Sequence, residues 1–94
     1  MPTLHLTTYD IADAKRLRRV ARVCERFGER VQESVFLMEL EPDEWRAMVH
    51  ELARLIDLES DAVRHIPVCR ADLARSRGLG LNSGLRQAPG HWVV

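Results

Sequence analysis

A single carboxylate followed by a row of arginines is the part of this 94-residue chain with the clearest chemical use. Asp10 stands where a stretch rich in apolar and β-branched residues ends, and residues 15–30 then carry seven basic and two acidic side chains. Carboxylate oxygens are ligands that Mg²⁺ accepts, and guanidinium groups bind phosphate through two parallel hydrogen bonds. The pattern therefore indicates a surface that handles phosphate groups.

The residues alone leave two roles open for Asp10. In the first, the Asp10 carboxylates of two subunits share one Mg²⁺ ion, which activates a water molecule for attack on a phosphodiester. In the second, Asp10 caps the turn that follows the strand, as aspartates often do. The residues alone favour the capping role, because one carboxylate per chain supplies few protein ligands for a metal ion.

Charge is segregated along the chain although the formal net charge is zero. Residues 33–61 hold two basic and nine acidic side chains, whereas residues 64–94 hold five arginines and one aspartate. Basic and acidic segments can therefore lie on different faces. Thirteen of the fourteen basic residues are arginine, which suits phosphate contacts, although a genome rich in arginine codons gives the same composition. We assign nucleic-acid contacts to Arg16, Arg19 and Arg30; the alternative is a solvated helix face.

Hydrophobic periodicity predicts the elements that carry these residues. A strand is expected from about residue 3 to Tyr9, with alternate side chains on opposite faces. Asp13 is a suitable N-cap for the helix that follows, and Gly28 is a suitable residue at its end. The buried stripe of this helix is expected to be Leu17, Val20, Ala21, Cys24 and Phe27.

The second half of the chain gives clear signals up to about residue 69. Residues 30–40 are extended in character and form either one long strand or two short strands joined by a bend near residues 32–34. Pro42 suits the first position of a second helix, which ends near Asp57. A further strand is expected over Val63–Cys69, and Pro67 indicates that it lies at a sheet edge.

This order of elements predicts an α+β fold, a ferredoxin-like βαββαβ sandwich with two helices on one face of an antiparallel sheet and an additional C-terminal strand. Residues 1–72 are expected to form the ferredoxin-like domain, and residues 73–94 a loop and tail strand that docks on a partner subunit. The other sheet face is left bare, so we expect a homodimer with Tyr9 and Phe36 at its interface.

Composition and hydropathy bear on where the protein works. No apolar run approaches the roughly 18–20 residues that a membrane span needs, and the N-terminus has no signal-peptide pattern. Cys24 and Cys69 are far apart without metal-like spacing, and Cys24 falls on the apolar helix face. These features predict a cytoplasmic protein without a membrane partner.

Four motifs together resemble those of the CRISPR-associated protein 2 family. They are Tyr9-Asp10-Ile11 at the end of the first strand, the basic helix start at residues 15–20, the run GERVQESVF at residues 28–36, and Ile56-Asp57 followed by residues 61–64 (DAVR). The resemblance covers residues 3 to about 69 with the spacings intact, and the combination is specific in a chain of this length. Residues 37, 38 and 65 depart from the usual family pattern.

The resemblance implies a homodimer that bridges dimers of the CRISPR-associated protein 1 integrase and holds a spacer DNA duplex. It also implies a metal-dependent endonuclease, acting on RNA or double-stranded DNA, in which Asp10 is the catalytic residue and holds Mg²⁺. Two alternatives stay open. One is a DNA-binding scaffold without physiological catalysis, and the other is a toxin-like nuclease of similar fold.

Overall fold

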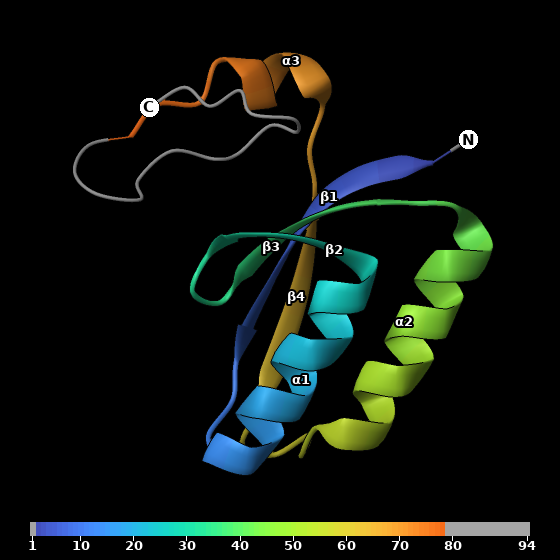
Figure 1. The fold of residues 1–94 in the computed structure, drawn as a ribbon, viewed down its shortest axis with the longest axis vertical. Coiled ribbons are helices and arrows are strands. Elements are labelled where there is room, and N and C mark those ends of the chain that lie inside the picture. Colours follow the sequence, from blue (N-terminus) through green and yellow to red (C-terminus); the bar gives the residue numbers. More distant parts are fainter. Residues whose placement is uncertain (1, 79–94) are drawn as a thin grey trace.

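A four-stranded antiparallel sheet with two long helices on one of its faces is the main feature of the computed structural model, which describes residues 2–78 (Figure 1). The elements follow one another as β1 Thr3–Asp10, α1 Ala14–Phe27, β2 Gly28–Gln32, β3 Val35–Leu40, α2 Pro42–Leu55, β4 Ala62–Pro67 and the short α3 Arg70–Ala74.

The strand order β2-β3-β1-β4 confirms the ferredoxin-like sandwich. β1 lies inside the sheet, paired with β3 on one side and β4 on the other, so Asp10 is at the end of an inner strand. Residues 28–40 form two strands rather than one, with the turn at residues 33–34. β4 is an edge strand, as Pro67 predicts. Proline has no backbone N–H to donate, and at the edge of a sheet this costs no hydrogen bond to a further strand.

Local signals set the helix ends as expected. The Asp13 carboxylate accepts a hydrogen bond from the Arg16 backbone N–H at 2.9 Å, which satisfies a donor of the first turn of α1. Pro42 begins α2, where Glu41 and Glu44 form a reciprocal capping box. Gly28 follows α1 with an extended backbone at φ −155°, so it is needed for space: a Cβ there would lie 2.6 Å from the Leu37 carbonyl oxygen.

Two residues predicted at the dimer interface, Tyr9 and Phe36, lie instead in the core between the sheet and the helices. Tyr9 is 6% exposed and Phe36 is fully buried, and both pack in the core beneath α1 and α2. The expectation that Tyr9 points to the bare sheet face, with Phe36 beside it at a dimer interface, is therefore wrong. His5 and Thr7 are also buried, which means that the more polar side of β1 faces the helices.

The opposite sheet face carries an apolar row across three strands. Leu6 on β1 pairs laterally with Leu37 on β3 and with Ile66 on β4, and Ile66 is 47% exposed. These side chains face away from α1 and α2 because alternate residues of a strand point to opposite faces. The buried Leu73 of α3 and Leu37 line a common groove at this face.

The C-terminal part of the predicted organisation is only partly covered. α3 lies across the predicted boundary at residue 72, and the sequence did not predict this helix. The tail strand falls within residues 79–94, outside the described residues, so its docking stays a prediction. Within residues 2–78, no helix has the length and apolar character needed to cross a membrane.

Candidate nucleic-acid and metal site at the end of β1

Asp10 lies on the rim of an open cleft of about 430 Å³ between the end of β1, the first turns of α1 and the β2–β3 turn. Asp10 itself is exposed, whereas neighbouring Tyr9 is buried. We call this hollow the Asp10 cleft; it is lined by Tyr9, Asp10, Ile11, Leu17, Arg18, Ala21, Arg30, Glu33 and Ser34. The cleft brings the carboxylate together with two guanidinium groups, those of Arg18 and Arg30.

Arg30 is held in the Asp10 cleft by two contacts. Its guanidinium carbon lies 5.1 Å from the centre of the Phe36 ring, a cation–π distance, and its Nη2 atom lies 3.5 Å from a Glu25 carboxylate oxygen. The Tyr9 hydroxyl donates a hydrogen bond to the Glu33 carbonyl at 3.3 Å and so joins β1 to the turn that follows Arg30. Burial raises the pKa of Tyr9, which therefore stays protonated and serves as a donor.

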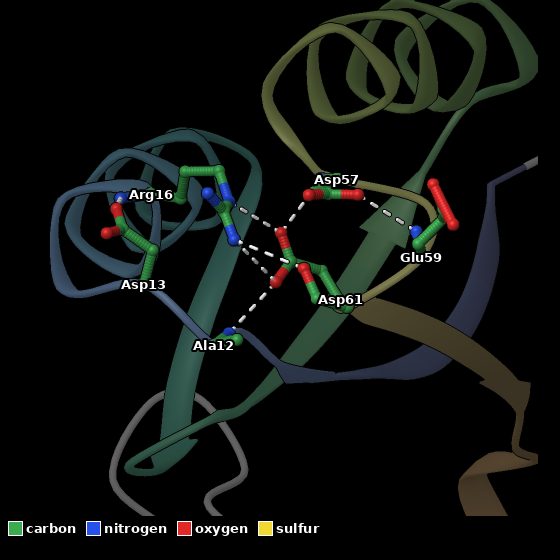
Figure 2. A network of polar contacts seen from close by, with 7 residues as sticks. Ala12, Asp13, Arg16, Asp57, Glu59 and Asp61 are labelled. Carbon is green, nitrogen blue, oxygen red and sulfur yellow. Dashed lines mark hydrogen bonds and ion pairs between the residues drawn. The ribbon is translucent and has the colours of Figure 1, made fainter.

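The turn that follows Asp10 is fixed by a buried carboxylate, that of Asp61 (Figure 2). Asp61 accepts hydrogen bonds from the backbone N–H of Ala12 at 2.9 Å and of Asp57 at 2.8 Å. The guanidinium of Arg16 adds a forked pair, with Nε at 2.8 Å and Nη2 at 3.2 Å. Four donors on one carboxylate tie the β1–α1 turn, α1 and the α2–β4 connection together.

Arg16 therefore has a structural partner that the sequence analysis did not assign. Its side chain is 28% exposed and its Nε and Nη2 atoms are directed at Asp61, whose side chain is fully buried. The remaining contact of Nη2 is the Ser60 hydroxyl at 3.4 Å. A guanidinium used in this way offers little to a phosphate, so we leave Arg16 out of the set of nucleic-acid ligands proposed below.

Arg19 differs from Arg16, because it is exposed and forms no ion pair within residues 2–78. Its neighbours Lys15, Arg18 and Arg22 share this property, and with Arg19 they line a hollow of about 250 Å³ on the outside of α1. The sequence could have suggested this group, since positions 15, 18, 19 and 22 follow the spacing of one helix face.

The donor set at Asp10 fits Mg²⁺ only in part within one chain. Among residues 2–78 there is no group of three His, Cys, Asp or Glu side chains that could hold a metal ion. Asp10 forms no side-chain hydrogen bond there, and the cap of the turn is Asp13. The capping role considered for Asp10 is thus wrong. A free, exposed carboxylate fits an ion that takes its other ligands from water, substrate phosphate or a second subunit.

A histidine pair lies between the sheet and the start of α2, apart from the Asp10 cleft. The rings of His5 and His65 each meet Trp45 edge to face at 4.4 Å between centres. His65 Nδ1 and the buried Thr7 hydroxyl share a hydrogen bond of 2.8 Å, whereas His5 Nε2 is buried with no partner within residues 2–78. Both histidines are therefore packing residues, and neither lines the Asp10 cleft.

Because of this pair, we expect the free energy of unfolding to fall as the pH is lowered from 6.5 to about 4. Burial, followed by the nearness of His5, lowers the pKa of His65 from 6.5 to about 4, and burial also lowers the pKa of His5. Between these values the unfolded chain binds more protons, so stability is complete above pH 6.5 and declines as the pH drops. Partial exposure of His65 limits the loss to about 1–2 kcal/mol.

Urea unfolding at several pH values, followed by circular dichroism, measures this loss. In His65→Gln the decline in that pH range is expected to be visibly smaller. His50→Gln is the matched control, because it replaces a histidine that is exposed on α2 rather than packed between the sheet and α2. Equal pH dependence in the wild type and His65→Gln would contradict the assignment.

Comparison with known proteins places the chain in a family. The model of the family "CRISPR associated protein Cas2" matches residues 3–76. The chain is 44% identical to "CRISPR-associated endoribonuclease Cas2 1" of Moorella thermoacetica, covering 63% of this chain and 67% of that protein. It is 41% identical to "CRISPR-associated endonuclease Cas2" of Halalkalibacterium halodurans, covering 65% and 69%. The Streptococcus pyogenes Cas2 crystal structure superposes with a TM-score of 0.75 at 35% identity, covering 82% of this chain and 99% of that one. The chain belongs to the CRISPR-associated Cas2 family.

Proposed function

We propose that the protein is a CRISPR adaptation protein with a magnesium-dependent phosphodiesterase site at Asp10. The observation that carries the proposal is the Asp10 cleft, in which one free carboxylate and the guanidinium groups of Arg18 and Arg30 line the same hollow. Membership of the Cas2 family supports it, and relatives in that family are named as endoribonuclease and endonuclease. The bond attacked is the phosphodiester of RNA or of double-stranded DNA.

Three residues that line the Asp10 cleft, Asp10, Arg18 and Arg30, have distinct tasks in this proposal. Arg18 and Arg30 bind and orient the phosphodiester, and the Phe36 ring with Glu25 keeps the Arg30 side chain in place before the substrate arrives. Asp10 is the protein ligand of the metal. Mg²⁺, when bound, polarises the phosphoryl oxygen and lowers the pKa of a coordinated water. The Asp61 network holds the turn after Asp10 and thereby fixes the end of β1.

We further propose a homodimer formed through the sheet face opposite the helices. The apolar row of Leu37, Leu6 and Ile66 supports this, since a second copy would remove it from water. These residues replace Tyr9 and Phe36 as interface candidates. In the adaptation complex this dimer bridges dimers of the CRISPR-associated protein 1 integrase in the cytoplasm and holds the spacer duplex through Arg19 and Arg30.

Replacing Arg18 and Arg30 together with alanine tests the proposal. We expect the affinity for nucleic acid to fall roughly tenfold or more, because two charge-assisted phosphate contacts are lost. The measurements are fluorescence anisotropy with labelled DNA and RNA, and spacer integration with the purified integrase. Arg46→Ala is the matched control, since Arg46 is exposed on α2 and is already paired with Asp43. Undiminished binding and integration in the double variant would refute the role of this cleft.

A further inference from the structure

The arginines of this chain fall into two groups when their partners are compared. Six arginines within residues 2–78 have a carboxylate partner in the same chain: Arg16, Arg26, Arg30, Arg46, Arg70 and Arg75. The others in that range have none there: Arg18, Arg19, Arg22, Arg54, Arg64 and Arg77. The difference is not one of exposure, because arginines of both groups are exposed.

Three of the unpaired arginines, Arg19, Arg22 and Arg54, converge on a groove between the two long helices. α1 and α2 lie side by side over the sheet (Figure 1), and a hollow of about 340 Å³ separates their outer surfaces. The groove is lined by Arg19, Arg22, Val23, Glu51, Arg54 and Leu55. Glu51 is its one carboxylate and is already paired with Arg26. Three guanidinium groups thus surround a partly apolar floor without a neutralising partner within the described chain.

This groove continues into the basic surface of α1. Arg19 and Arg22 line both the groove and the hollow on the outside of α1 that contains Lys15. Residues 15 to 22 span about 10 Å along the helix axis, which corresponds to about three nucleotides of one strand at 3.4 Å each. Like charges at helical spacing destabilise a helix, so this arrangement costs stability unless an anion is bound.

We propose that the groove between α1 and α2 binds the phosphate backbone of a DNA duplex through Arg19, Arg22 and Arg54. This inference rests on the proposed function and extends it to a surface separate from the Asp10 cleft. The residues that line the groove include no aromatic side chain, whereas single-stranded nucleic acid is typically held by stacking on aromatic rings. Phosphate contact alone suits a duplex, whose bases are stacked inside.

The test is the variant in which Arg22 and Arg54 are both replaced by alanine. Arg46→Ala is the matched control, because Arg46 is an exposed arginine on α2 that is paired with Asp43 and does not line the groove. Binding of a short labelled DNA duplex is measured by anisotropy over a range of salt concentrations. We expect a loss of about 5–20-fold in affinity and a salt slope smaller by about 1.5–2, from two lost phosphate contacts. Two unrelated duplex sequences should be affected equally.

The possible outcomes separate this inference from the proposed function. If the wild type binds duplex DNA and the double variant binds equally well, the groove is not a phosphate site and the Asp10 cleft is unaffected. If only single-stranded RNA binding falls, or only capture of the integrase, the duplex assignment is overturned. If the wild type itself binds no nucleic acid, the proposed function fails. A thermal midpoint unchanged or raised in the double variant excludes misfolding as the cause of a loss.

Discussion

Replacing Asp61 with alanine is expected to lower the midpoint of thermal unfolding by roughly 10–20 °C, because a buried carboxylate that accepts four hydrogen bonds is removed from a small domain. Its side chain is fully buried, and its loss leaves the Arg16 guanidinium and the backbone N–H groups of Ala12 and Asp57 without their acceptor. These groups join three parts of the chain (Figure 2), so the whole sandwich is loosened. Differential scanning calorimetry measures the shift.

The pH dependence of this effect has a definite direction. The Arg16 guanidinium, followed by the Asp57 and Ala12 N–H groups, holds the pKa of Asp61 well below its usual value of 3.8. A carboxyl with a depressed folded pKa contributes stability that is complete above its unfolded pKa and is lost as the pH falls. The difference in midpoint between the wild type and Asp61→Asn is therefore expected to be constant above about pH 5 and to shrink below about pH 4.

Asp43→Ala serves as the control for Asp61, since Asp43 is an exposed aspartate with an arginine partner on one turn of helix. Exposed pairs of this kind contribute little, so its midpoint should shift by only a few degrees. A shift of similar size in the two alanine variants would mean that the Asp61 network does not hold the turn.

The sequence predicted those features of the fold that depend on neighbours along the chain. Asp13 and Pro42 mark helix starts, because their capping and backbone properties act within a few residues. Gly28 also marks the end of α1 as predicted, but the structure requires a glycine there for space beside Leu37 of β3. The turn at residues 33–34 stayed undecided between one strand and two, since no glycine or proline is present there. The structure describes two strands, with a register shift between Arg30 and Gln32.

The prediction of which face of β1 is covered by the helices was wrong, because that choice depends on residues far away in the sequence. His5, Thr7 and Tyr9 look like the more polar side of β1, yet they face the helices. Two of them find distant partners there: the Thr7 hydroxyl bonds to His65, and the Tyr9 hydroxyl bonds to the Glu33 carbonyl. Period-two alternation separates the two faces of a strand but does not say which of them is covered.

The division of the arginines could not be predicted for the same reason. Arg16 and Asp61 are 45 residues apart, and Arg26 and Glu51 are 25 apart, so neither ion pair follows from helical spacing. Among the arginines that remain, Arg19, Arg22 and Arg54 are grouped by the packing of α1 beside α2. The sequence therefore predicted a basic helix correctly, but the identity of its available arginines is a property of the folded chain.

Asp10→Ala is expected to lower magnesium-dependent cleavage of RNA or duplex DNA by roughly 100-fold or more, because the protein ligand of the metal is lost. The thermal midpoint should change little, since Asp10 is exposed and forms no side-chain hydrogen bond within residues 2–78. Cleavage is measured with matched purified preparations, with and without a chelator. Asp10→Asn distinguishes ligation from turn formation: asparagine supports a turn as aspartate does but is a poorer ligand for Mg²⁺.

The expected pattern is therefore that both Asp10 variants lose cleavage while both keep the wild-type fold. Equal residual cleavage in the wild type and Asp10→Ala would point to a contaminating nuclease and would refute catalysis at Asp10. Spacer integration is the second measurement, because the groove between α1 and α2 and the apolar sheet row do not include Asp10. An Asp10→Ala protein that still supports integration separates the scaffold function, carried by the arginines, from the chemistry at the end of β1.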